Sequence, residues 1–434
     1  MSSISITIGD WIKGTPPEEL AFTNVPLKIK LDDEIITQLS DRESRSLRDD
    51  LFIPLYPLAE WIAANWWRLL YECNDLHRRN DLSYEYCHYM RYAGDGYFLP
   101  DLRIMPCGNE IVFDCIRRAD DLYSFVNSFK TSVPLKDVES EFKKFIELVI
   151  SRLLHCDIKK TVLQKDWAAI NATLRDKEER FFCIAAAQLG LDPYNITEEL
   201  SDSIISAYEL LNNKVELGDY FSAVPQSNLG EITAWMNNVA DKMLNNTPKN
   251  KTLANIKKEI SVVADGETPW AQGYKIANFI SKKLFGGKKS TQRLYDFIDS
   301  AQIKFDSRPI SPLFCNALVS SSSNNEPAFM VDLQENTTKN NFLAGRMLGE
   351  YFCNIKTSIV NCISVAKTFN QQRNRAFAAE LLAPAAFIKE KLGDSKEVDY
   401  DAISELASEC QTEEFVIRYQ IQNHHLAKIT PQYI

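Results

Sequence analysis

The sequence has few histidines and none of the paired arrays through which histidine and cysteine usually bind metals. Its 434 residues include five histidines, at positions 77, 88, 155, 424 and 425, and no HExxH pair. The ten cysteines form no CxxC pair and are scattered, several of them within apolar runs. An even number of cysteines is compatible with disulfides. In a chain of this size without a secretory signal, however, we expect buried free thiols.

Membrane spans and phosphate-binding loops are also missing from the sequence. No stretch approaches the ~18 uninterrupted apolar residues of a membrane helix. The first residues, MSSISITIGDWIKG, show no basic region followed by an apolar one. We therefore expect a cytoplasmic protein with no membrane partner. The run GGKKS at 286–290 follows a predicted helix and lacks the first glycine of a P-loop, which excludes a nucleotide-binding loop of that kind.

The overall composition is that of a folded protein with an acidic balance. Hydrophobic residues make up 45% and charged residues 25% of the chain. At roughly 150 residues per domain, the length predicts two to three domains. The formal net charge of −10 repels phosphate backbones, so the charge does not support nucleic-acid binding, although a local basic face stays possible.

The first part of the chain, residues 1–155, combines strand and helix patterns. Apolar and polar residues alternate at 4–8, which predicts a strand, and the run at 55–72 predicts a helix. Residues 98–115 predict two strands around a turn. A helix over about 135–155 is expected to close this mixed N-terminal domain.

The rest of the chain is richer in helix patterns. Residues 156–265 predict a helical middle region, and the polar run at 245–251 is a candidate linker. Residues 266–434 predict a further domain, whose expected elements follow. They are a helix at 271–285, β-prone stretches at 313–319 and 327–333 joined through a loop at 320–325, and helices at 340–353, 370–382 and 384–392. The fold class expected for the whole chain is α+β and helix-rich.

The most specific signal is the stretch NRAFAAELLAPAAF at 374–387. It resembles the second half of ImmA/IrrE metallopeptidase domains, where a helix of the form ExEANxFAAxLLxP contributes the third zinc ligand. The stretch at 326–352 resembles the strand and the HExxH helix that precede it in this family, and residues 400–424 resemble its helix-turn-helix-like tail. The resemblance implies a zincin-like domain over 266–434.

The same resemblance shows that the zinc chemistry is missing. A zinc peptidase needs two histidines at i and i+4, a glutamate beside the first, and a third ligand from elsewhere. When Leu343-Ala344 is aligned with the LA of the family motif, Gly345 and Gly349 stand at the histidine positions and Arg346 stands at the glutamate. A shift by one residue places Arg346 and Glu350 at the ligand positions instead.

The two acidic positions of the family's second helix are also replaced, by Gln371 and Arg373. Because a guanidinium keeps its charge, Arg346 and Arg373 would repel a metal cation. They would either attract a carboxylate or phosphate, or lie at the surface or in a local ion pair. Gly345 and Gly349 either allow the 370–382 helix to approach closely, or line a groove for a peptide or small molecule.

These features favour a non-catalytic, peptidase-like protein without a cofactor. We expect it to bind a protein partner through a groove at Gly345, Arg346, Gly349, Glu350, Gln371 and Arg373. The resemblance implies a bacterial regulator or sensor in anti-phage defence, mobile-element control or stress response. Two alternatives are an enzyme whose active site lies in residues 1–265, and a DNA-binding regulator that uses the tail. The tail has few basic residues, and the oligomeric state stays open.

Overall fold

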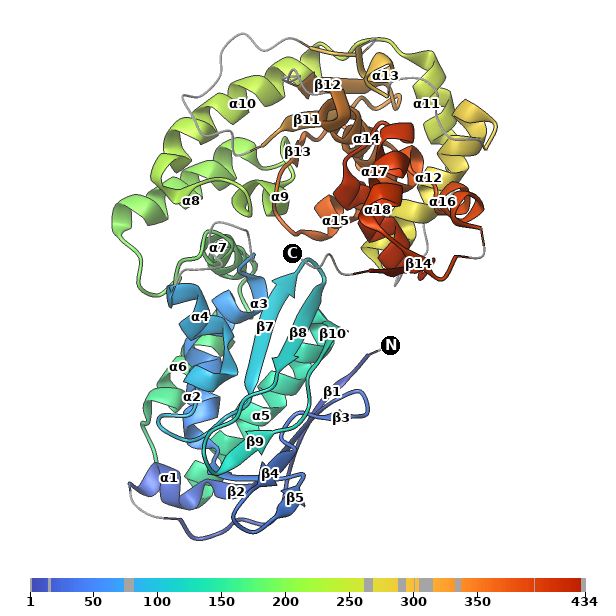
Figure 1. Cartoon of the computed structure of the whole chain (residues 1–434). Coiled ribbons are helices and arrows are strands. Elements are labelled where there is room, and N and C mark those ends of the chain that lie inside the picture. The colour runs from blue at the N-terminus through green and yellow to red at the C-terminus, as the bar shows by residue number, and fades with distance from the viewer. Residues whose placement is uncertain are drawn as a thin grey trace. The chain divides into compact units, whose positions relative to one another are not determined.

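The computed structural model describes residues 2–14, 17–73, 82–260, 268–287, 294–299, 301–303, 315–331, 337–393 and 395–430. The chain folds into two compact units, Met1–Ile204 and Ile205–Ile434 (Figure 1). The division between them lies inside the region that the sequence pattern assigned to a helical middle. The expected boundary at 265/266 lies outside the described residues, and the three-part division stays a prediction.

Unit 1, Met1–Ile204, contains small antiparallel sheets. The first sheet has the order β1-β2-β3 and β6 also pairs with β2, the second has the order β5-β4-β9, and the third has the order β10-β8-β7. The strands are β1 (Ile4–Ile8), β2 (Asn24–Leu31), β3 (Glu34–Ile35), β4 (Leu39–Asp41), β5 (Ser46–Arg48), β6 (Leu51–Pro54), β7 (Asp101–Cys107), β8 (Glu110–Ile116), β9 (Tyr123–Phe125) and β10 (Phe129–Pro134). Strand β2 alternates half-buried and buried residues along its length, as expected of a strand with one face on a core.

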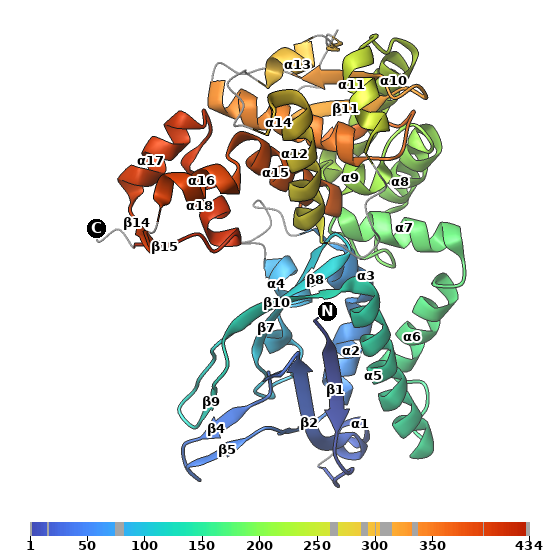
Figure 2. The ribbon, with the colours of Figure 1, turned by 90° about the vertical axis from the view of Figure 1, so that its right-hand side faces the viewer.

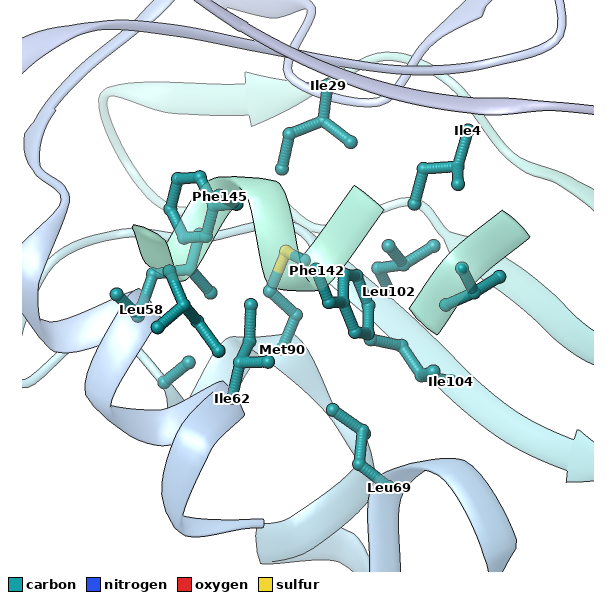
Figure 3. Packing of buried hydrophobic residues seen from close by; sticks show 14 of the residues in the cluster. Ile4, Ile29, Leu58, Ile62, Leu69, Met90, Leu102, Ile104, Phe142 and Phe145 are labelled. Carbon is teal, nitrogen blue, oxygen red and sulfur yellow. The ribbon is translucent and has the colours of Figure 1, made fainter. Parts of the chain in front are cut away.

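The helices of unit 1 cover these sheets and share one core with them. They are α1 (Glu18–Phe22), α2 (Tyr56–Ala64), α3 (Trp66–Tyr71), α4 (Leu82–His88), the 3-10 turn η1 (Met90–Tyr92), α5 (Leu135–His155), α6 (Val162–Thr173) and α7 (Lys177–Gln188), and α8 (Glu198–Leu211) crosses into the next unit. Helix α5 runs beside β1 (Figure 2). Figure 3 shows Phe142 and Phe145 of α5 among Leu58 and Ile62 of α2.

Several predictions for unit 1 are confirmed. The strand at 4–8, the strand pair within 98–115 and the helix at 135–155 are all present. The expected helix at 55–72 is broken at Asn65 into α2 and α3. Helices α6 and α7 contribute to the same core as the preceding residues, so the start of the expected middle region packs with the N-terminal domain.

Unit 2, Ile205–Ile434, is dominated by helices. Its elements are α9 (Leu217–Phe221), η2 (Gln226–Asn228), α10 (Leu229–Asn245), α11 (Lys251–Lys258), α12 (Pro269–Phe285), α13 (Tyr295–Asp299), β11 (Ala317–Ser321), β12 (Pro327–Val331), α14 (Thr337–Cys353), β13 (Asn361–Ile363), α15 (Phe369–Leu382), α16 (Ala385–Leu392), β14 (Glu397–Val398), α17 (Tyr400–Glu409), α18 (Glu414–Asn423) and β15 (Lys428–Ile429).

Helix α15 lies at the centre of unit 2. It packs against α12, α14 and α18, while β11 at the middle of the antiparallel sheet β12-β11-β13 contacts α14. Ten of its fourteen residues are buried. Its start is fixed by Thr368, whose side chain accepts a hydrogen bond from the Gln371 backbone N–H, as in a typical helix N-cap. Helix α12 begins with a threonine cap and a proline and ends at Gly286, which has φ of 64°.

The predicted helices of unit 2 are present, and the fold class is α+β with small sheets and a majority of helix. The ends of the predicted β stretches at 313–314 and 332–333 lie outside the described residues. Residues 317–319 and 327–331 lie in β11 and β12, residues 315–316 precede the strand, and the predicted loop begins two residues late, at Ser322. The polar run at 245–251 joins α10 to α11 within unit 2. All ten cysteines are free, as expected; eight are buried, whereas Cys107 and Cys156 are only half-buried. Among the described residues, no helix has the length and apolar character needed to cross a membrane.

Candidate functional site

The two glycines of α14 face α15 at very short range. A Cβ atom at Gly345 would lie 3.0 Å from Cβ of Ala378, and one at Gly349 would lie 3.0 Å from Cδ1 of Phe377. Glycine at these positions therefore permits a close approach of the two helices. Of the two interpretations of these glycines, close helix contact is confirmed, and the expectation of an open groove between them is corrected because α15 fills that space.

Arg346 is buried, with 5% of its surface exposed, so it is not a surface residue. One of its guanidinium nitrogens, Nη2, donates to the carbonyl oxygen of Ser364 at 2.6 Å and to Oε1 of Gln371 at 2.7 Å. Burial, together with the nearby charge of Arg375, holds its pKa well below the usual value. The arginine at the expected position of the catalytic glutamate thus links α14 to the start of α15.

Glu350 is fully buried and interacts with α15. Its carboxylate accepts hydrogen bonds from Nδ2 of Asn354, at 2.9 Å, and from Nδ2 of Asn374. Nη2 of Arg373 lies 3.9 Å from Oε2 of the same carboxylate. The expectation of a local ion pair is confirmed for Arg373, which is only 7% exposed.

All six residues singled out in the sequence therefore come together at the α14–α15 contact, and all are buried. They form an internal polar cluster and do not line an exposed groove. Its geometry joins two helices and strand β13 through hydrogen bonds to buried carbonyl oxygens. Each such bond stabilises the fold mainly because a buried donor or acceptor without a hydrogen bond would cost about 1–3 kcal/mol.

Two further charged residues belong to this cluster and were missed in the sequence. Asp219 of α9 accepts hydrogen bonds from Oγ1 of Thr368 and from Nδ2 of Asn370, at 3.2 Å for the latter. Burial, with a smaller contribution from Glu350, raises the pKa of Asp219 to about 6. Because Asp219 lies about 150 residues before its partners in the chain, no local pattern identifies it.

The second missed residue is Lys257 of α11. Its ammonium donates to Oγ of Ser321 at 3.1 Å and lies 4.6 Å from the centre of the Tyr351 ring. Burial lowers the pKa of Lys257 to about 8. Because a lysine in a helix with many polar residues is ordinarily exposed, the local sequence pattern does not predict the burial of Lys257.

The residues of this cluster do not fit a zinc ion. Glycine supplies no ligand at positions 345 and 349, and Arg346 and Arg373 carry positive charge where a peptidase would hold a cation. In the part of the chain that the structure describes, no group of three or more histidine, cysteine, aspartate or glutamate residues is placed to hold a metal. The buried cationic side chains of Lys257, Arg346 and Arg373 are hydrogen-bond donors, so they interact with oxygen atoms and not with a metal ion.

A groove borders another side of α15. It has a volume of about 590 Å³ and is lined by residues of α12, α15 and α18, with Phe342 of α14. The helical spacing of its aromatic residues, Trp270 with Tyr274 and Phe415 with Tyr419, is visible in the sequence, but no motif there marks it as a binding surface.

The tail consists of two helices, α17 and α18, joined by a short turn at 410–413, and its likeness to a helix-turn-helix stays a prediction. Helix α18 buries Val416, Ile417, Gln420 and Ile421. It contacts α15 and α16, so the tail packs onto the domain core.

The chain was compared with protein-family models, curated proteins and solved structures, and none of them matches it.

Proposed function

We propose that the C-terminal part of this chain is a peptidase-like domain of the ImmA/IrrE type that has lost zinc chemistry and acts by binding a protein. The proposal depends on one observation. The positions that the resemblance assigns to zinc ligands and to the catalytic base lie together on α14 and α15, and they are occupied by a helix contact and a buried polar cluster.

The physical reason for a non-catalytic role is the chemistry of these positions. A metal-activated water requires ligands that hold the ion and a base that accepts a proton. Here Arg346 has no basic lone pair to offer, and its Nη2 already donates to two oxygen atoms. In such a domain the peptidase-like arrangement of helices is kept, and the residues at the positions of the zinc site stabilise the contact between α14 and α15.

The biological setting that we propose follows from the resemblance alone. Active members of that family regulate or cleave helix-turn-helix repressors in phage immunity, mobile-element control and stress response. We therefore propose a bacterial regulator or sensor that binds such a partner without cleaving it. Phage plating on the native host with and without the gene tests this setting, and equal plating efficiency for a broad phage panel would count against it.

Metal analysis tests the loss of zinc chemistry. The purified full-length chain is incubated with zinc, passed over a desalting column and analysed for bound metal, beside an ImmA/IrrE peptidase with an intact HExxH motif. We expect about one zinc per chain in the intact peptidase and close to none here. About one zinc per chain retained here after desalting would overturn the proposal.

The binding role is tested separately. The chain is cross-linked in native cells, purified, and its cross-linked partner is identified and then made recombinantly. We expect the pure partner to bind the chain in solution and to keep its intact mass after prolonged incubation. Cleavage of the partner by the pure chain would show a peptidase, and failure of every recombinant partner to bind would remove the binding role.

A further inference from the structure

The groove beside α15 has two aromatic walls and a floor of small residues. Trp270 and Tyr274 lie one turn apart on α12, and Phe415 and Tyr419 lie one turn apart on α18. Ala376 and Ala379 of α15 lie in the lining beside them. Small side chains between aromatic ones leave room for a side chain of a ligand to enter.

The aromatic rings in this groove remain accessible. The exposed fractions are 40% for Trp270, 42% for Phe415 and 57% for Tyr419. The Phe415 ring also contacts the ring of Phe342, with centroids 5.7 Å apart, which extends the apolar wall onto α14. Exposed aromatic side chains that are partly held by neighbours are typical of the residues that dominate binding energy at interfaces.

A buried acceptor in the lining points to a ligand with an N–H group. Gln420 is fully buried, and its Nε2 donates to Oε2 of Glu380 at 2.7 Å and to the carbonyl oxygen of Ala383 at 2.9 Å. Its Oε1 has no hydrogen-bond partner among the described residues. A buried acceptor without a partner is destabilising, and a donor on a ligand would remove that cost.

The charge of the lining favours an acidic ligand. It includes the guanidinium of Arg375 and no aspartate or glutamate, while the carboxylate of Glu380 behind it is hydrogen-bonded to Nε2 of Gln420 at 2.7 Å. Arg375 is held at this edge because its Nη2 donates to the carbonyl oxygens of Ser364 and Ala366, at 3.1 and 2.9 Å.

We infer that the groove binds an extended segment of a partner protein that carries a carboxylate beside an apolar side chain. The apolar side chain lies between the aromatic pairs, a backbone N–H donates to Oε1 of Gln420, and the carboxylate lies near Arg375. An extended peptide fits better than a helix, because it offers backbone N–H groups along its length, whereas a helix leaves them free only in its first turn. A single arginine is too little positive charge for a nucleic acid. The inference rests on the proposed binding function and gives it a surface and a ligand class.

The test uses the full-length chain and random peptides displayed on phage. Enriched peptides are made with a fluorescein label, and their binding is measured by fluorescence polarisation, beside a labelled oligothymidine as the nucleic-acid probe. We expect enriched peptides to share an apolar residue near an aspartate, a glutamate or a free C-terminus. Replacing that carboxylate by an amide should weaken binding about tenfold.

Matched variants locate the binding surface. Trp270→Ala and Tyr419→Ala should each weaken peptide binding about tenfold or more. Ile355→Ala, at a position 76% exposed in the same unit, and Tyr86→Ala, at a position 56% exposed in unit 1, should leave it unchanged. Circular dichroism confirms that each variant is folded.

Three outcomes overturn the inference. They are the absence of any enriched peptide, peptide binding that survives both groove variants, and oligothymidine binding that the groove variants abolish. The second outcome leaves the proposed binding function intact and rejects only the groove. The zinc measurement is independent of all three, so the two proposals can fail separately.

Discussion

Gly273 of α12 is the residue at which the packing of α15 is tightest. A Cβ atom there would lie 2.5 Å from the carbonyl oxygen of Arg373 and 2.9 Å from the backbone nitrogen of Phe377. Because both atoms belong to the backbone, no side-chain rotation relieves the contact. Gly273→Ala should therefore lower the free energy of unfolding of unit 2 by about 1–3 kcal/mol, although alanine ordinarily favours a helix by about 1 kcal/mol.

Urea denaturation followed by circular dichroism measures this difference. Gly230→Ala in α10 is the matched control, since a Cβ atom there would meet no atom within 4 Å. It should leave stability unchanged or raise it by up to about 1 kcal/mol. Equal stability of the Gly273→Ala variant and the wild type would show that α12 and α15 are less closely packed than described.

The buried carboxyl of Asp219 should make the stability of unit 2 depend on pH. Its pKa is raised from 3.8 to about 6, chiefly by burial. Over this interval the folded state keeps a proton that the unfolded chain has released. This contribution is therefore fully present below about pH 4 and is lost as the pH rises through about 6. The full effect is on the order of 3 kcal/mol.

Asp219→Asn removes this titration and keeps an oxygen that can accept the hydrogen bond from Thr368. Urea denaturation at several pH values should show a smaller loss of stability between about pH 4 and about pH 6 than in the wild type. Asp401→Asn, at an exposed position of α17, should keep the wild-type dependence. The same slope in the Asp219→Asn variant and the wild type would assign the pH dependence to other groups.

At the scale of elements, α15 is a helix that is buried along most of its length. Ten of its fourteen residues are buried, whereas α16, which follows it, buries only Ile388 among eight. Backbone amides in a helix surrounded on all sides exchange only when the whole unit opens. Hydrogen exchange followed by mass spectrometry should show α15 among the slowest segments of unit 2 and α16 among the faster ones. Rapid exchange throughout α15 would contradict its central position.

The elements also show what the sequence could and could not predict. Local patterns predicted β1, α5 and α12, because alternation, helical spacing and capping residues act over a few positions. The break at Asn65 was missed since the apolar pattern continues through it. For the site, the spacing of Gly345 and Gly349 indicated either close helix contact or a groove, and the structure shows the close contact. The burial of Arg346 was not predictable, because its partners Ser364 and Gln371 lie 18 and 25 residues further along the chain.

For the whole molecule, the separation of the hydrophobic cores has a measurable consequence. The core of unit 1 includes residues from Ile4 to Ala187, and two of the cores of unit 2 include residues from Leu253 to Ile421. Since none of the described residues belongs to more than one of these three cores, we expect a cavity in one of them to lower the stability of its own unit. We chose Phe142 of α5 and Leu381 of α15 as fully buried test positions.

Phe142→Ala should destabilise unit 1 by about 3–5 kcal/mol, and Leu381→Ala should destabilise unit 2 by about 2–5 kcal/mol. Proteolysis in increasing urea, with peptides assigned to each unit by mass spectrometry, reports the two transitions separately. Each variant is the control for the other, because each should move one transition and leave the other at its wild-type midpoint. If both transitions move together in both variants, the two units fold as one cooperative structure, and stability changes made near α15 would then extend to residues 1–204 as well.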